Sequence, residues 1–226
     1  MQVKRHVPHA DGRSRTEMKW KIGIVGFFFL CISAAGGFGQ EQDALKMYKE
    51  GNYEEAVEIC RAELEVMPQR MDAYVVLCWS LIKLNRYEEA LETARKAYQI
   101  SPTDYRVIEI LGEAHFFLGN NLKALQFFEQ YVVIAPTGDR IDMVYYYMGE
   151  IFIRLGEFNH ADIAISTALY HNPNIARWWS RLGYAREMSS DYTYALDAYR
   201  KALQLNATFP EAERGIQRVL EKMESG

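Results

Sequence analysis

Apolar side chains recur every three to four residues along most of the chain, which is the spacing of a buried helix face. One such face reads Ile108, Leu111, Gly112 and His115, at positions i, i+3, i+4 and i+7. Short polar breaks interrupt the pattern at residues 50–52, 84–86, 118–120, 155–157 and 189–191. The pattern therefore predicts five pairs of helices, each pair joined by a tight turn.

The helix pairs are copies of one repeating unit. Pro68, Pro102, Pro136 and Pro173 follow one another at intervals of 34, 34 and 37 residues, and an alanine lies 12 residues before each of them. A fixed period of this length is typical of stacked helical repeats. The expected units cover residues 41–70, 71–104, 105–141, 142–175 and 176–209. An amphipathic segment at 210–226 predicts a final helix that caps the open end of the stack.

A small residue occupies the middle of the apolar face in the first helix of each unit. The five positions are Ala44, Cys78, Gly112, Gly149 and Gly183. A bulky side chain there would push the two helices of a pair apart, and packed helices tolerate overfilling poorly. We therefore expect the first helix to approach the second closely, with the alanine of the second helix at the contact.

These residues resemble the tetratricopeptide repeat family. The third unit carries the family's pattern at Leu111, Gly112, Gly119, Ala124, Phe128 and Pro136. The fifth unit carries it at Trp179, Leu182, Gly183, Tyr184, Tyr192, Ala195, Tyr199 and Ala202. The resemblance implies an all-α fold, a right-handed α-solenoid of about five helix-turn-helix units plus a C-terminal capping helix. The chain departs from the pattern at three extra residues, 137–139, and at the fifth turn, which lacks glycine.

The first 39 residues differ from the rest and have the layout of an export signal. Lys19 and Lys21 precede an uncharged apolar run at 22–39, which ends in small residues. We expect cleavage between Gly39 and Gln40, with a cut after Ala35 or Gly37 as the alternative, and Met18 is a candidate translation start. The run is slightly shorter than the ~20 residues of a spanning helix, so an uncleaved inner-membrane anchor is the alternative. In both cases residues 40–226 are expected to be exported and to face the bacterial periplasm.

The exported part is acidic. Residues 40–226 contain 20 Lys and Arg against 28 Asp and Glu, a net charge of −8. Nucleic acids and anionic membrane surfaces need a basic footprint, so neither is an expected partner. Membrane contact is expected only through the signal segment, if it is uncleaved.

In the resembled family, the first helices of successive units line a concave groove. Positions on that face of this chain carry aromatic and acidic side chains: Tyr48, Trp79, Glu109, Glu113, Phe116, Phe117, Tyr146, Glu150, Tyr184 and Glu187. Aromatic side chains anchor partners well, which predicts a protein or peptide partner with apolar anchors and basic residues. The alternative is that some of these aromatics pack against neighbouring first helices.

The chain shows no catalytic motif and no metal-binding spacing of histidines or cysteines, so neither enzyme activity nor a cofactor is expected. Cys60 and Cys78 should face the same contact between units, either as a disulfide or as small core residues. The function predicted is a non-catalytic interaction scaffold or adaptor in the cell envelope. One alternative is a periplasmic small-ligand-binding accessory of a solute uptake system, in which an apolar ligand is enclosed by Trp79, Phe116, Phe117, Tyr146 and Tyr184. Another is an outer-membrane assembly helper.

Overall fold

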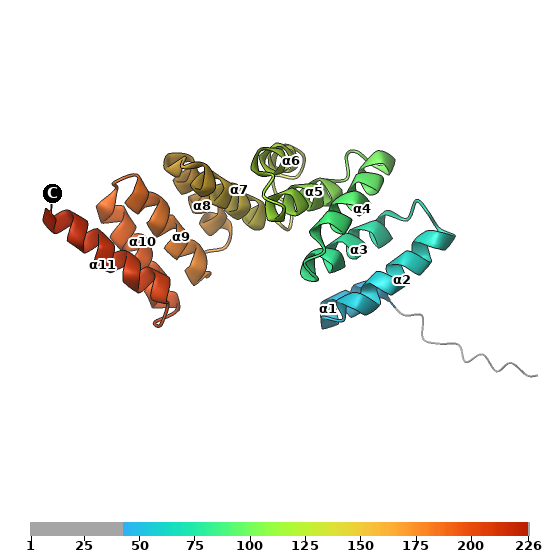
Figure 1. Ribbon diagram of the computed structural model, residues 1–226, viewed down its shortest axis with the longest axis horizontal. Helices are drawn as coiled ribbons and strands as arrows, with labels where there is room; N and C mark the ends of the chain where they lie inside the picture. Colours follow the sequence, from blue (N-terminus) through green and yellow to red (C-terminus); the bar gives the residue numbers. More distant parts are fainter. Residues whose placement is uncertain (1–42, 226) are drawn as a thin grey trace, which may run out of the picture. The chain divides into compact units, whose positions relative to one another are not determined.

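The computed structural model describes residues 43–225, and these form eleven α-helices and no strand (Figure 1). The helices are α1 (Ala44–Glu50), α2 (Tyr53–Val66), α3 (Met71–Lys83), α4 (Tyr87–Ile100), α5 (Tyr105–Phe117), α6 (Asn121–Ile134), α7 (Ile141–Leu155), α8 (Phe158–His171), α9 (Ala176–Met188), α10 (Tyr192–Leu205) and α11 (Pro210–Ser225). The expected all-α solenoid is confirmed. The expected export signal, its cleavage site and Met18 lie outside the described residues.

The helices stack in chain order as five pairs followed by α11. Each helix contacts the next, and the first helices of neighbouring pairs also contact one another, in the series α1–α3, α3–α5, α5–α7, α7–α9 and α9–α11. The second helices lie farther apart: among the described residues no two of them pack backbone against backbone, although Arg61 on α2 pairs with Glu89 on α4 and Tyr98 on α4 meets Phe127 on α6. The first helices therefore form one continuous layer, and the second helices spread apart on its other side.

The alanine that recurs with the proline period lies in the core of every pair. Ala56, Ala90, Ala124, Ala161 and Ala195 have no exposed surface. Each is the fourth residue of its second helix, at a fully buried position where a larger side chain would have no free space. The repeat period therefore reflects a packing requirement that is met at the same place in all five pairs.

The small residues of the first helices contact large side chains. A Cβ atom added to Gly112 would lie 2.5 Å from the ring of Phe128, and one added to Gly183 would lie 2.7 Å from the ring of Tyr199. Gly149 meets Ile165 in the same way. A large core residue of the second helix therefore packs over each of these glycines. The close approach itself is as expected.

The turn inside each pair uses a left-handed backbone conformation. Gly51, Gly119 and Gly156 have φ between 74° and 86°, and Asn85 and Ser190 adopt the same conformation at the equivalent positions, with φ of 58° and 65°. Left-handed φ costs an L-residue ~1–2 kcal/mol, and only glycine and, to a lesser degree, asparagine adopt it readily. Ser190 is therefore the least suitable of the five turn residues.

Replacing Ser190 with glycine should stabilise the protein by about 0.5–1 kcal/mol, because the strain relieved exceeds the added freedom of the unfolded chain. Urea unfolding followed by circular dichroism measures the change. Ser189→Gly is the matched control, since Ser189 has φ of −87° and gains nothing from glycine. Equal stability of wild type and Ser190→Gly would show that the turn is not strained.

The connection between the third and fourth pairs is longer than the others. It comprises residues 135–140, whereas the other connections between pairs have four residues each. The three extra residues noted in the sequence fall in this region, and the connection ends at Arg140, directly before α7. This lengthened connection positions the side chain on which the site described below depends.

Candidate functional site

The ten predicted groove residues all belong to the layer of first helices, and we call the face of α1, α3, α5, α7 and α9 that carries them the inner face. Five of the ten are buried, with exposed fractions of 1–6%: Glu109, Glu113, Phe116, Tyr146 and Glu187. Tyr48, Trp79, Glu150 and Tyr184 are partly exposed, and Phe117 is 39% exposed. The expectation of a free ribbon of aromatic and acidic side chains along the groove is therefore wrong for half of its members.

The acidic side chains of the inner face are held by arginines from the following helix pair. The pairs are Asp72–Arg106 at 2.7 Å, Glu113–Arg140 at 3.0 Å, Glu150–Arg181 at 2.6 Å and Glu187–Arg218 at 2.7 Å. In each case the acid belongs to the earlier helix pair, and the base comes from the next pair, from the connection that leads into it or, for Glu187, from α11. We refer to this series as the ion-pair ladder. It neutralises the acidic groove expected from the sequence.

Two glutamates of α5 share one arginine in the interior of the stack. The Arg140 Nε donates to Glu109 Oε1 at 2.8 Å, and its Nη2 lies 3.0 Å from Glu113 Oε2. The Tyr147 hydroxyl donates to Glu113 Oε1 at 2.8 Å. Burial and the neighbouring Glu113 charge raise the pKa of Glu109 to about 8, so this carboxyl keeps its proton at neutral pH. Arg140 is thus the cation that both buried carboxyl groups contact.

The last step of the ladder fastens α11 to the fifth pair. Arg218 donates to Glu187 through Nε and Nη2, at 3.0 and 2.7 Å, and Lys222 Nζ donates to the same carboxylate at 2.9 Å. Burial opposes ionisation of Glu187, but hydrogen bonds from Arg218, Lys222 and Tyr199 outweigh it and lower the pKa to about 2. The expected capping helix is thus held by charge as well as by its apolar face.

The aromatic side chains pack in small groups and do not form one continuous stripe. The ring centres of Tyr48 and Trp79 are 5.7 Å apart, and Phe117 stacks on Tyr87 with ring centres 4.7 Å apart. Tyr146, by contrast, stacks on Trp178 in the next pair at 4.9 Å. Packing against neighbouring helices, the alternative considered above, therefore accounts for much of the aromatic content. Tyr48, Phe117 and Tyr184 keep part of their surface exposed.

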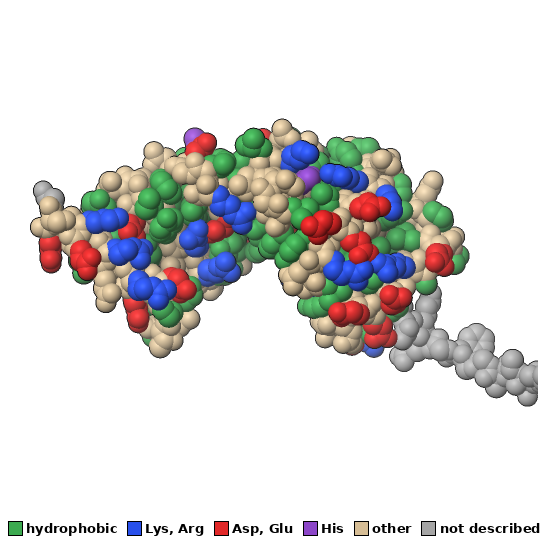
Figure 2. Space-filling view, viewed as in Figure 1, with side chains coloured by type: hydrophobic (Ala, Val, Ile, Leu, Met, Phe, Trp, Pro, Cys, Tyr) green, Lys and Arg blue, Asp and Glu red, His purple; other side chains and the backbone are tan. Residues whose placement is uncertain are grey.

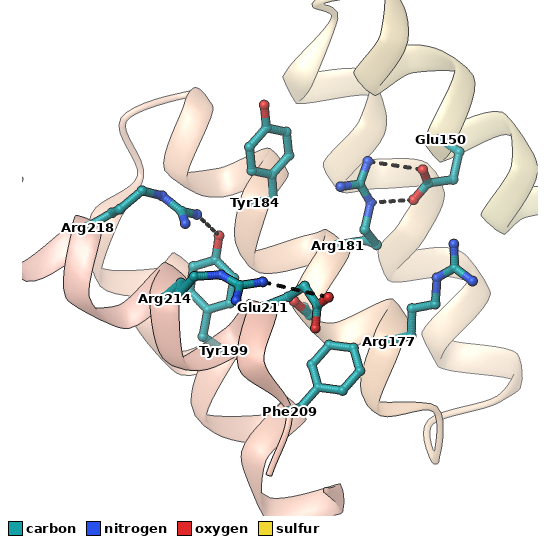
Figure 3. Close-up of a pocket in the computed structure, with 10 residues that line it drawn as sticks. Glu150, Arg177, Arg181, Tyr184, Tyr199, Phe209, Glu211, Arg214 and Arg218 are labelled. Carbon is teal, nitrogen blue, oxygen red and sulfur yellow. Dashed lines mark hydrogen bonds and ion pairs between the residues drawn. The ribbon is translucent and has the colours of Figure 1, made fainter. Parts of the chain in front are cut away.

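The inner face holds a basic pocket of about 710 Å³ near its C-terminal end, shown in Figure 3. Arginines from two helices converge on it, Arg177 and Arg181 from α9, and Arg214 and Arg218 from α11. Of these, the sequence pattern places only Arg177 on the groove face, and it predicts partner binding for none of them. The sequence does contain a pattern that indicates these pairs, since the two arginines of each helix are four residues apart and so lie on one side of it.

A second, smaller cavity lies at the centre of the inner face. It has a volume of about 110 Å³, and Trp79, Glu109 and Arg140 are among the side chains that line it. Ligand pockets usually have volumes of ~300–1,000 Å³, so this cavity is too small for a metabolite. The five aromatic residues expected to enclose an apolar ligand do not meet in one of these two pockets. Tyr184 lines the basic pocket, Trp79 lines the smaller cavity, and neither pocket is lined by Phe116, Phe117 or Tyr146.

The two cysteines of the described chain are buried free thiols. Burial raises the pKa of Cys60 to about 12, and the Cys78 Sγ lies 3.7 Å from the Ala90 carbonyl oxygen. These thiols are unreactive core residues, which favours small-residue packing over the disulfide. His115 is likewise a core residue, 3% exposed and stacked on Phe127.

Residues 43–225 contain no cluster of three or more histidine, cysteine, aspartate or glutamate side chains suited to a metal ion. Over the same residues, no helix combines the length and the hydrophobicity needed to cross a bilayer.

Comparison with known proteins agrees with the repeat architecture. Residues 42–147 and 146–212 each match a family model described as Tetratricopeptide repeat. No curated protein matches the sequence. MamA from Desulfovibrio magneticus RS-1 has a similar structure, with a TM-score of 0.64 and 18% identity over 73% of this chain and 92% of that chain.

Two other solved structures share the fold. YrrB, described as a TPR protein with an unusual peptide-binding site, has a TM-score of 0.63 at 17% identity over 77% of this chain and 88% of that chain. The APC/C hetero-tetramer Cut9–Hcn1 has a TM-score of 0.71 at 15% identity and covers 78% of this chain and 35% of that chain. At these identities the likeness shows the fold alone.

Proposed function

Because this chain belongs to the tetratricopeptide repeat family, we propose that it is a non-catalytic scaffold or adaptor that binds a peptide or helix of a partner protein along its inner face. The observation that carries this proposal is the continuous layer of first helices, whose inner face combines partly exposed aromatics with a basic pocket. A curved layer of helices of this kind presents an extended surface that suits a chain-like partner. The description of YrrB as a peptide-binding TPR protein supports the same use of the fold.

The proposed place of action is the cell envelope. The basic residues and apolar run of the first 39 residues support export, with residues 40–226 in the periplasm. Cleavage of the signal would release the protein, and retention of the segment would anchor it in the inner membrane. The repeat units face the periplasm in both cases. An outer-membrane assembly helper would be one form of the same scaffold.

The small-ligand alternative has less support. It required five aromatic side chains to enclose an apolar ligand, and two of them, Phe116 and Tyr146, are buried in contacts between helices. The basic pocket is large enough for a small molecule, but charged side chains dominate its lining. An interaction with a protein segment uses both the pocket and the exposed aromatics beyond it.

Site-specific crosslinking tests the proposed binding face. A photoreactive amino acid placed at Phe117 or Tyr184 on the inner face should crosslink a partner protein in cells of the source organism. The matched control is the same amino acid at Tyr170, which is 85% exposed on α8, in the layer of second helices. Crosslinked products identified by mass spectrometry should be specific to the inner positions.

Two outcomes would contradict the proposal. Equal crosslinking at Tyr170 and at the inner positions would mean that the inner face is not the binding face. Absence of the protein from the periplasmic fraction and from the inner membrane of the same cells would contradict the proposed location.

A further inference from the structure

The side chains around the basic pocket carry an excess of positive charge in a chain that is acidic as a whole. Four arginines line it against two glutamates, Glu150 and Glu211, whereas residues 40–226 have a net charge of −8. Figure 2 shows Lys and Arg side chains over α7, α9 and α11 with Asp and Glu among them, and a second group of Lys and Arg over the N-terminal helices. A local excess of positive charge attracts anionic groups.

Two of the four arginines have no close ion pair. Arg177 makes no hydrogen bond or ion pair within residues 43–225, and it is exposed. Arg214 has only Glu211 nearby, at 3.8 Å on the same exposed helix face. An exposed pair at this distance contributes little to stability. Both guanidinium groups are therefore available to an incoming anion.

The other two arginines are fixed in place by the ion-pair ladder. Arg181 binds Glu150 through Nε and Nη2, and Arg218 binds Glu187 through the same two atoms. In both cases the remaining nitrogen, Nη1, has no hydrogen-bond partner in the described part of the chain. These guanidinium groups are thus oriented in advance and keep donors for a second carboxylate, which reduces the entropy lost on binding.

The pocket also offers aromatic surface beside the charges. Tyr184 and Phe209 line it, and the Arg181 guanidinium lies 5.2 Å from the centre of the Tyr184 ring. Phe209 directly precedes Pro210, the first residue of α11, so the positive end of that helix also lies at the pocket. Together the charges and rings suit a segment in which carboxylates flank an apolar side chain.

We infer that the basic pocket between α9 and α11 binds an acidic segment of a protein partner, in which two or more Asp or Glu side chains flank an apolar or aromatic residue. This inference rests on the proposed function and names its partner class. It replaces the basic partner expected from the sequence, because the glutamates on which that expectation depended are paired inside the ladder. A nucleic acid fits less well, since the basic area is confined to four arginines on an acidic protein.

Selection from a random peptide library tests the inference while the partner is still unidentified. Phage displaying random dodecapeptides are selected on the purified full chain, and the enriched sequences are compared with the unselected library. Asp and Glu should be enriched next to an apolar residue. Synthetic versions of the enriched peptides, amidated at the C-terminus to remove the terminal carboxylate, then give dissociation constants by fluorescence anisotropy.

The variant Arg177→Glu with Arg214→Glu should weaken binding of these peptides by roughly tenfold or more, since it reverses two charges that contact the carboxylates. Neither arginine holds a buried carboxylate, so the fold should be kept, which circular dichroism checks. The matched control is Arg200→Glu with Lys201→Glu, the same charge change on the exposed side of α10. The control should bind within about twofold of wild type, because exposed charges away from the site are screened.

The outcomes separate this inference from the proposed function. Enrichment of basic or neutral peptides, or acidic peptides that bind the Arg177/Arg214 variant as well as wild type, would overturn the acidic partner and leave the scaffold intact. Displacement of the peptides by an equal concentration of inorganic phosphate would show a phosphate site and would also overturn it. No enrichment of any peptide, together with no crosslinking at the inner face, would reject the scaffold itself.

Discussion

Replacing Arg140 with methionine should lower the free energy of unfolding by about 3–5 kcal/mol, because it removes the cation that the two buried carboxyl groups of Glu109 and Glu113 share. Methionine keeps much of the apolar volume of the side chain, so the loss measures charge more than packing. Urea unfolding at neutral pH, followed by circular dichroism, gives the value. The matched control is Arg200→Met, at a surface arginine whose ion pair with Asp197 is exposed, which should cost less than about 1 kcal/mol.

The pH dependence distinguishes this account from a simple packing loss. The folded protein raises the pKa of Glu109 from 4.5 to about 8, so between these pH values the folded state holds a proton that the unfolded state has lost. The stability contributed by this proton is fully present below pH 4.5 and is lost as the pH rises through 8. Glu109→Gln cannot titrate, so the variant should gain stability relative to wild type between pH 5 and pH 8. A constant difference across that range would contradict the raised pKa.

Gly112→Leu should cost about 1–3 kcal/mol through overpacking, since its Cβ alone would lie 2.5 Å from the Phe128 ring. Gln126→Leu on the exposed side of α6 is the control and should change stability little. Combining Gly112→Leu with Phe128→Ala should give a loss smaller than the sum of the single losses, because leucine fills part of the space of the ring. Additive losses in urea unfolding would mean that the two residues do not meet.

The helix pairs could be predicted from the sequence because their signals lie within one repeat. The proline period, the buried alanine and the polar breaks each report on contacts a few residues apart, and these recur in every unit. The inner face of the first helices could also be predicted from its i, i+3 and i+7 spacing. What the spacing does not report is whether a side chain on that face is free or is covered by the next unit.

The charge balance of the site could not be predicted for this reason. Glu113 and Arg140 are 27 residues apart in the chain, and Glu150 and Arg181 are 31 apart. A helical pattern relates residues three or four positions apart, so it cannot show that the acid of one pair meets the base of the next. The three extra residues indicate a longer connection, but nothing in their sequence indicates that Arg140 turns back onto α5. The helical spacing therefore predicts an exposed, repelling surface where the structure has paired carboxylates.

The ion-pair ladder is directional, because in each of its ion pairs the acid precedes the base in the chain. Each acid of the ladder is paired with a cation that follows it in the chain. Among the described helices, α11 brings two cations to the ladder, Arg218 and Lys222, and none of its own acids continues the ladder. Removing α11 would leave the carboxylate of Glu187 on α9 without its cations. A further repeat inserted before α11 would need a basic residue at the position that pairs with Glu187. The carboxylate of Glu187 on α9 thus depends on α11 for the positive charge that balances it.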